Sequence, residues 1–261
     1  VILGNGFYDA VNLNIPCSKF GDECLRLQLQ LTYADGTTQT VISDNTWETK
    51  PSAITLNGVH AGEIYNANLE TPLWATTEDN SQGWQRVKCI EGPTGMMTAH
   101  TAPTDKIVET LKPISLHQRE DGAWVVDFGK EISGWLHLHD LKGEKGDTVK
   151  VDYISESVQG NMRYVMNGSG SEEYAPRFTW FAFSKAVISG VKELSMRNLT
   201  ADVVNTHVEK TADFHTTDTL FNRINEIWQR SQLDNMHGGI ASDCPHRERL
   251  PYTGDGEAAC A

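Results

Sequence analysis

Two neighbouring segments of the chain have the pattern of β-strands, Trp124-Val125-Val126-Asp127-Phe128-Gly129 and, a few residues later, Trp135-Leu136-His137-Leu138-His139. The first is a short apolar run that is bounded by a glycine. The second alternates apolar and polar side chains, as expected of a strand with one face buried and the other in water. We therefore predict two strands here, the first of which ends at Gly129.

The same pattern extends along the chain in both directions. Leu25-Arg26-Leu27-Gln28-Leu29-Gln30-Leu31 alternates without a break, and Asp35-Gly36 then predicts a tight hairpin turn into a return strand from Thr38 to Ile42. Short strands that are separated by turns about every ten residues are typical of antiparallel sandwiches. The predicted fold class is mainly β, with two consecutive antiparallel β-sandwich domains over residues 1–100 and 101–210.

The character of the sequence changes at about residue 212. Apolar residues recur there with the spacing of one helix face, namely Leu220, Phe221, Ile224, Ile227 and Trp228. Thr217 or Asp218 can cap the start of this helix of about 20 residues, and Gly238-Gly239 can end it. A second helix is predicted to begin near Asp255, so residues 211–261 read as the first hairpin of a helical domain.

The charge balance narrows the range of partners. The 261 residues contain 22 Lys and Arg against 35 Asp and Glu, a formal net charge of −13. Nucleic acids and anionic membranes need clustered basic residues, so we expect neither as a partner. No segment approaches the roughly 20 continuous apolar residues of a membrane span. The five cysteines form no Cys-x-x-Cys pair, which argues against a zinc site, and we expect neither a metal nor a cofactor.

The densest polar cluster lies between the two predicted helices, in Asp243-Cys244-Pro245-His246-Arg247-Glu248-Arg249-Leu250-Pro251-Tyr252-Thr253-Gly254-Asp255. Its prolines and glycine predict a loop rather than a helix. Neighbouring carboxylates can take different pKa values, so that one serves as an acid while others stay ionised. Arg247 and Arg249 could tune that balance or grip a polar substrate, and Tyr252 could stack on a sugar. Sugar hydrolysis needs such a set of groups.

Plainer interpretations stand beside these. A charged loop is most often a solvated connector, and Cys244 fits a small buried apolar group better than a nucleophile. His137 and His139 share a strand face and could bind a metal, but no third ligand is near them in sequence, which favours a solvent-facing pair. Four tryptophans could form a sugar platform, although such residues more often pack in a core: Trp74, Trp84, Trp124 and Trp135.

Residues 243–255 resemble the signature of the bacterial α-L-rhamnosidases, glycoside hydrolase family 78. Gly62-Glu63-Ile64-Tyr65-Asn66-Ala67 and Asp127-Phe128-Gly129-Lys130-Glu131-Ile132-Ser133-Gly134-Trp135 resemble earlier family segments in the family's order. The similarity spans essentially the whole chain. It implies an N-terminal β-sandwich whose start is missing, a second sandwich, and the first helices of a truncated (α/α)6 barrel that carries catalysis.

The resemblance also implies roles for individual residues. The family releases terminal α-L-rhamnose from rhamnosides by an inverting acid/base mechanism, and its motif puts the general acid at Glu248. Asp243 and Asp255 match acidic residues that bind the rhamnose, Tyr252 matches an aromatic position that lines the sugar, and Arg247 matches a site arginine. The family's general base lies beyond Ala261, so we expect the chain alone to be inactive.

Two features depart from the usual family pattern. Pro251 stands where glycine is more usual, and this chain has one acidic residue fewer than many members between the arginine and the glutamate of the loop. Both bear on substrate choice more than on the class of enzyme.

Two other functions compete with this one. One is a non-catalytic carbohydrate-binding or scaffold β-sandwich module, and the other is a glycosidase of a different (α/α)6 family. The expected partner is a rhamnose-containing glycoside or polysaccharide. A homodimer stays open, and so does the choice between bacterial cytoplasm and periplasm.

Overall fold

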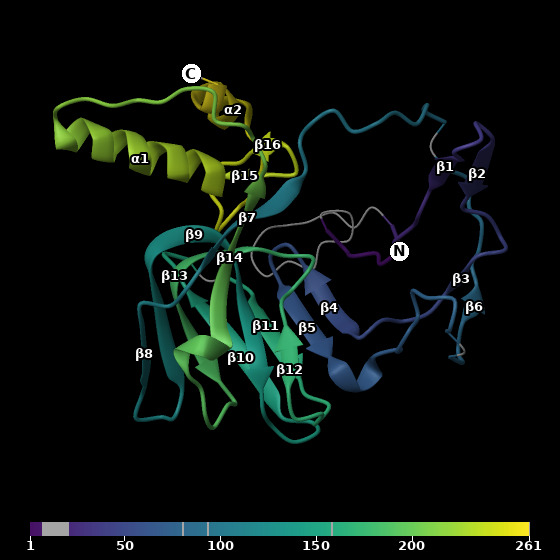
Figure 1. Cartoon of the computed structure of the whole chain (residues 1–261), viewed down its shortest axis with the longest axis horizontal. Coiled ribbons are helices and arrows are strands. Elements are labelled where there is room, and N and C mark those ends of the chain that lie inside the picture. Colours follow the sequence, from purple (N-terminus) through teal and green to yellow (C-terminus); the bar gives the residue numbers. More distant parts are fainter. Residues whose placement is uncertain (7–20, 80, 93, 158, 261) are drawn as a thin grey trace.

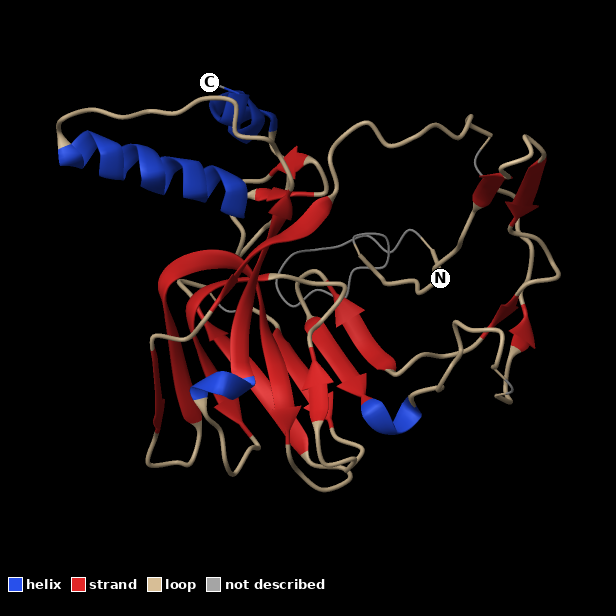
Figure 2. Ribbon diagram, viewed as in Figure 1, coloured by secondary structure: helices blue, strands red, loops and turns tan. Residues whose placement is uncertain are grey.

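The computed structural model describes residues 1–6, 21–79, 81–92, 94–157 and 159–260, and it confirms a mainly β chain (Figures 1 and 2). Its largest sheet curls on itself and has ten strands, with β4-β5-β11-β10-β13-β9-β14-β7 in spatial order and with β8 and β12 also paired to β9. The strands of this sheet are β4 (Ile54–Gly58), β5 (Gly62–Asn66), β7 (Asp105–Leu111), β8 (Ser115–Gln118), β9 (Trp124–Leu141), β10 (Thr148–Ile154), β11 (Asn161–Val165), β12 (Glu172–Tyr174), β13 (Phe181–Ser189) and β14 (Leu199–Thr206).

An arm with two short pairs of strands lies to the right of this sheet in Figure 1. There β1 (Gln28–Thr32) pairs with β2 (Thr38–Ile42) through the predicted turn, where Gly36 has a φ of 85°. A second pair joins β3 (Glu48–Thr49) to β6 (Gln85–Arg86). Strands β4 and β5 belong instead to the large sheet, because β5 runs parallel to β11 and pairs with it. The domain bounds at residues 100 and 210 stay predictions.

Strand β9 corrects the prediction of two strands, because it runs unbroken through eighteen residues from Trp124 to Leu141. Gly129, with a φ of 79°, turns the chain inside the strand rather than ending it. Its amide donates to Asp127 Oδ1 at 2.7 Å, and the pairing with β13 jumps between Phe183 and Lys185 at this bulge. The resulting bend lets β9 pair with β8 near its start and with β12 near its end.

The core lies between the layers of this curled sheet. Side chains at alternate positions of its central strands are fully buried, including Ile132, Leu136, Leu138, Met162, Phe181, Phe183 and Ile188. The rings of Tyr153 and Phe181 stack at 3.9 Å. Trp124 and Trp135 pack against this core, as the plainer interpretation expected, and are only partly exposed.

The two described α-helices lie above the same end of the sheet, and two short 3-10 helices, Ala67–Leu69 and Met196–Asn198, lie elsewhere on it (Figure 2). Helix α1 (Thr219–Asp234) begins at Asp218, whose Oδ1 accepts from the Leu220 amide at 2.9 Å. It ends before Asn235, so Gly238-Gly239 does not end the helix. The two glycines instead form the turn between β15 (Met236–His237) and β16 (Ile240–Ala241). Helix α2 (Thr253–Cys260) starts two residues before Asp255.

The apolar stripe of α1 is largely open to solvent. Its side chains are exposed by 47% to 63%, namely Leu220, Phe221, Ile224, Ile227 and Trp228. Neither described helix is long and apolar enough to cross a membrane. The predicted amphipathic helix is therefore confirmed, but the described residues leave much of its apolar face exposed.

The C-terminal end of α1 is fastened to the bend of β9. The buried carboxylate of Asp234 accepts from the Ser133 amide at 3.0 Å, and Ser133 Oγ lies 2.7 Å from His237 Nε2. The His237 ring stacks on Trp180 at 4.1 Å. Burial raises the pKa of Asp234 to about 7 because the charged form loses its hydration.

We predict that Asp234→Asn changes the pH dependence of stability. The pKa of Asp234 in the folded protein lies above its ordinary value of 3.8, so ionising Asp234 lowers the free energy of unfolding. This loss is absent at low pH and grows until about pH 7. The wild type should lose up to about 3 kcal/mol relative to the variant between roughly pH 4.5 and pH 8. Urea denaturation of both proteins across this range measures the difference. Glu226→Gln, at an exposed position of the same helix, is the control. A difference independent of pH would contradict the assignment.

Candidate active site

The loop between β16 and α2 is closed on itself by backbone and side-chain contacts. The Asp243 amide donates to the Leu250 carbonyl at 3.2 Å, and the Leu250 amide donates to Asp243 Oδ1 at 3.1 Å. One oxygen of Asp243 therefore holds the two ends of the loop together. The residues between them form a bend, and contacts with the large sheet fix the position of this bend.

Arg249 fastens this bend to the large sheet. Its side chain is 97% buried, and its guanidinium donates from Nη1 to the Val59 carbonyl and from Nη2 to Gln159 Oε1 at 3.1 Å. The guanidinium carbon also lies 5.4 Å from the centre of the Trp180 ring, within cation–π range. Burial lowers the pKa of Arg249 to about 9. The suggestion that Arg249 could grip a substrate is therefore wrong, because the side chain points into the protein.

The backbone of Arg249 is adapted to this inward turn. Its φ of 56° is in the left-handed region, which is uncommon for residues other than glycine. Two further contacts hold the residues before it. His60 Nε2 lies 2.9 Å from the Glu248 carbonyl oxygen, and Ser157 Oγ donates to the His246 carbonyl at 3.2 Å. Val59 and His60 belong to the β4–β5 turn, and Ser157 and Gln159 to the β10–β11 connection.

The Glu248 carboxylate is paired with the residue before it in the same loop. Its Oε2 accepts from Arg247 Nε at 2.7 Å and from Cys244 Sγ at 3.3 Å. The Arg247 guanidinium lowers the pKa of Glu248 to about 2, so this carboxyl is ionised at neutral pH. Cys244 Sγ also lies 3.4 Å from Asp243 Oδ2, so the thiol bridges the two carboxylates. Burial raises the pKa of the Cys244 thiol, which fits the prediction that it is not a nucleophile.

The structure brings some of the predicted site residues together and leaves others apart. Asp243, Arg247 and Glu248 form one contact cluster. Tyr252 is half exposed on the loop before α2, and Asp255 lies in the first turn of α2. Within the described residues, no hydrogen bond or ion pair joins Tyr252 or Asp255 to Glu248. The roles that the resemblance gives to all five residues stay predictions.

The anchoring role of Arg249 is what sequence reasoning missed. Its partners Val59 and Gln159 are 190 and 90 residues away in sequence, so no local pattern connects them. The sequence itself does not distinguish the two arginines, because both adjoin Glu248. The structure shows that Arg247 pairs with Glu248, whereas Arg249 is buried and has no carboxylate partner among the described residues.

We predict that Arg249→Lys destabilises the chain by about 1–3 kcal/mol. A lysine cannot reach both acceptors with the planar geometry of a guanidinium, which leaves a buried acceptor unpaired. Arg247→Lys is the matched control, because the Arg247 side chain is 67% exposed and should change stability by less than about 0.5 kcal/mol. Urea denaturation of the three proteins measures both effects. Equal effects of the two substitutions would rule out the anchoring role of Arg249.

Family models match consecutive parts of the chain. Residues 1–109 match the α-L-rhamnosidase N-terminal domain, residues 117–205 the bacterial α-L-rhamnosidase concanavalin-like domain, and residues 209–261 the bacterial α-L-rhamnosidase 6 hairpin glycosidase domain. The cluster around Glu248 lies within the third match.

Individual proteins give the same result. An α-L-rhamnosidase of Formosa agariphila is 31% identical over 286 residues, which cover 100% of this chain and 30% of the relative. The α-L-rhamnosidase structure from Dictyoglumus thermophilum matches with a TM-score of 0.88 at 28% identity, over 99% of this chain and 30% of that one.

The Streptomyces avermitilis α-L-rhamnosidase, solved in complex with L-rhamnose, matches with a TM-score of 0.87 at 25% identity, over 95% of this chain and 26% of that one. The chain thus spans about 30% of the length of the relatives that it matches. Over that span, with its β-sheet part followed by the first helices of the glycosidase domain, the chain belongs to the bacterial α-L-rhamnosidase family.

Proposed function

We propose that this chain is part of a glycoside hydrolase that releases terminal α-L-rhamnose from rhamnosides or rhamnose-containing polysaccharides, with Glu248 as the general acid. The observation that carries the proposal is that Glu248 directly precedes the residue that anchors its loop. The Glu248 carboxylate contacts Arg247 and Cys244 of the same loop, while the next residue, Arg249, anchors the loop to the β4–β5 turn of the large sheet. A general acid has to be held in one place relative to the glycosidic oxygen, and this anchor supplies that constraint.

The mechanism that we propose is inverting, and its general base lies outside this chain. An inverting pair of carboxyl groups needs about 6.5–9.5 Å between them to leave room for a water. Asp243 is the carboxylate beside Glu248, but its oxygen lies within 4.8 Å of the Glu248 oxygen, and it also closes the loop. Asp243 therefore suits substrate binding better than water activation. The chain length, about 30% of the relatives' length, supports a base from the remaining part of the domain.

The ion pair with Arg247 has to open for Glu248 to act as an acid. A pKa of about 2 leaves too little of the protonated form at neutral pH. The Arg247 side chain is exposed and therefore free to turn toward a sugar hydroxyl. We propose that substrate and the missing helices displace it, which raises the pKa of Glu248 by removing a cation and adding burial. Asp255 and Tyr252 would then bind and stack on the rhamnose, and the missing helices would cover the apolar stripe of α1.

We predict that the effect of Glu248→Gln depends on the leaving group of the substrate. The test uses a protein that contains this chain together with the rest of the catalytic domain. Activity on an alkyl rhamnoside, whose poor leaving group needs protonation, should fall by roughly a thousandfold or more. Activity on a nitrophenyl rhamnoside should fall less, and L-rhamnose binding measured by calorimetry should persist. Glu257→Gln on α2, at an exposed position, is the control.

Equal losses on both substrates, or full activity, would exclude Glu248 as the acid. Unchanged turnover would favour a non-catalytic role for the loop. A panel of nitrophenyl glycosides tests the sugar, because preference for another sugar would place the enzyme in a different (α/α)6 family.

We also predict that the purified 261-residue chain does not hydrolyse an aryl α-L-rhamnoside, since it lacks the base. The assay compares the rate with buffer alone and with the Glu248→Gln chain. Turnover that depends on Glu248 in the isolated chain would contradict the proposed place of the base.

A further inference from the structure

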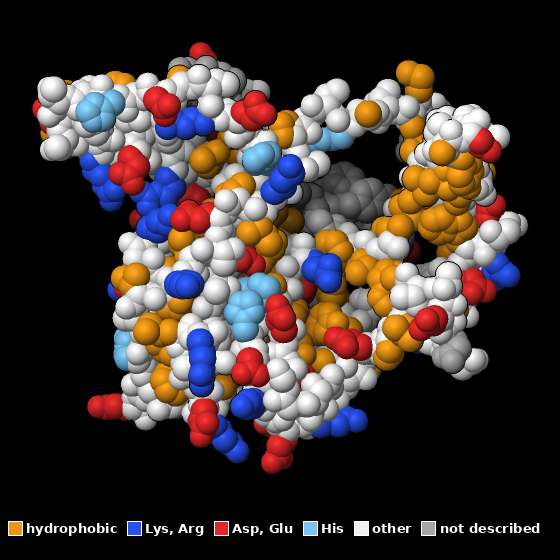
Figure 3. Space-filling view, in the orientation of Figure 1, with side chains coloured by type: hydrophobic (Ala, Val, Ile, Leu, Met, Phe, Trp, Pro, Cys, Tyr) orange, Lys and Arg blue, Asp and Glu red, His pale blue; other side chains and the backbone are white. Residues whose placement is uncertain are grey.

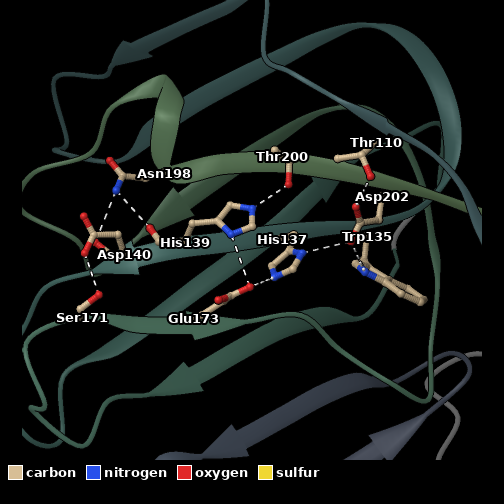
Figure 4. A network of polar contacts seen from close by, with 10 residues as sticks. All are labelled: Thr110, Trp135, His137, His139, Asp140, Ser171, Glu173, Asn198, Thr200 and Asp202. Atoms are coloured by element: carbon tan, nitrogen blue, oxygen red, sulfur yellow. Dashed lines mark hydrogen bonds and ion pairs between the residues drawn. The ribbon is translucent and has the colours of Figure 1, made fainter.

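A second polar cluster lies on the large sheet, among residues that the Glu248 loop does not use as hydrogen-bond partners (Figure 4). His137 and His139 project from the same face of β9, and their rings are 4.1 Å apart. Glu173 reaches them from β12, which pairs with the end of β9. The sequence offered no third ligand near the histidines, but the fold brings one from 36 residues away. Histidine and acidic side chains also stand side by side near the middle of this face in the space-filling view (Figure 3).

Three potential ligand atoms converge in this cluster. His137 Nε2 lies 2.7 Å and His139 Nδ1 lies 3.5 Å from the same oxygen, Glu173 Oε1. All three atoms lie within 4.8 Å of one another. A zinc ion with bonds of about 2.0–2.1 Å keeps its tetrahedral ligand atoms roughly 3.3 Å apart. Small side-chain adjustments would therefore accommodate such an ion.

The outward nitrogens of both histidines have acceptors on the neighbouring strand β14. His137 Nδ1 lies 3.2 Å from Asp202 Oδ2, and His139 Nε2 lies 2.8 Å from Thr200 Oγ1. When these nitrogens carry the protons, the inward nitrogens present lone pairs toward Glu173. Histidines that bind metals are typically oriented in this way, by a carboxylate or another acceptor on the second nitrogen.

Asp202 is itself held firmly in place. Its side chain is 4% exposed, and it accepts from Thr110 Oγ1 at 2.9 Å and from Trp135 Nε1 at 3.3 Å. A fixed carboxylate on one side of His137 and a second carboxylate, Glu173, on the other make the space between the rings and Glu173 complementary to a cation.

We propose that His137, His139 and Glu173 bind one divalent transition-metal ion, with zinc as the best match and water completing its coordination. Two imidazoles and one carboxylate suit zinc better than magnesium or calcium, which prefer oxygen ligands alone. The bound ion cross-links β9 to β12. The Glu173 side chain is 64% exposed, so the ion exchanges with solvent. This site differs from the expectation of no metal, which considered only ligands close together in sequence.

The test is a titration of the purified chain with zinc in competition with a chromogenic chelator. We expect one equivalent to bind and the melting temperature to rise with zinc concentration. His139→Ala and Glu173→Gln should each weaken binding by roughly tenfold or more and reduce the shift in melting temperature. Glu173 is exposed, so its substitution should leave the fold intact even if His139→Ala does not.

Two controls locate the bound ion. His117→Ala, an exposed position on β8, should bind zinc as the wild type does. Cys244→Ser should also retain binding, because Asp243, Cys244 and Glu248 are the other group among the described residues whose atoms could hold a metal. The proposal is overturned if the wild type binds less than one equivalent, if Glu173→Gln and His139→Ala bind as tightly as the wild type, or if Cys244→Ser abolishes binding.

Discussion

A buried guanidinium that has no carboxylate partner among the described residues determines where the loop with the candidate acid lies. Removing Arg249 from water carries a large penalty, which only well-placed acceptors and a polarisable ring can offset. The Val59 carbonyl, Gln159 and Trp180 supply them from three separate connections between strands of the sheet. Because Glu248 precedes Arg249 directly, the same contacts position the candidate acid. The β-sheet part of the chain thus helps to position the candidate site.

Two carboxyl groups whose pKa values move in opposite directions illustrate what a general acid requires. Asp234 is buried without a direct cation partner, and its pKa rises to about 7. Glu248 has a side chain that is 24% exposed and is paired with Arg247, and its pKa falls to about 2. A general acid needs an environment closer to that of Asp234. Burial under further helices and displacement of Arg247 would both move Glu248 in that direction, which is why the proposed function involves residues outside this chain.

Local features of the fold were predictable from the sequence. The Asp35-Gly36 turn and the Asp218 cap depend on neighbouring residues alone. The turn was predicted correctly, and Asp218 is one of the two caps that the sequence offered. The continuity of β9 could not be predicted locally. A glycine at this place suggests the end of a strand, and the pairing with β13 on both sides of Gly129 shows that the strand continues. The helix end was assigned wrongly to Gly238-Gly239, which suits a hairpin turn equally well.

The same distinction between local and long-range information applies to the candidate site. The motif around Glu248 could be recognised from sequence, whereas the inward direction of Arg249 and the approach of Glu173 to the histidine pair depend on partners dozens of residues away.

Hydrogen exchange at the loop tests most directly whether the sheet holds the acid in place. The Leu250 amide donates to Asp243 Oδ1 and reports on closure of the loop, while the Val151 amide in β10 reports on the sheet. The account predicts that Arg249→Lys accelerates exchange at Leu250 by roughly tenfold or more relative to Val151. Unchanged relative exchange at Leu250 would contradict it, because the loop would then be ordered without its anchor.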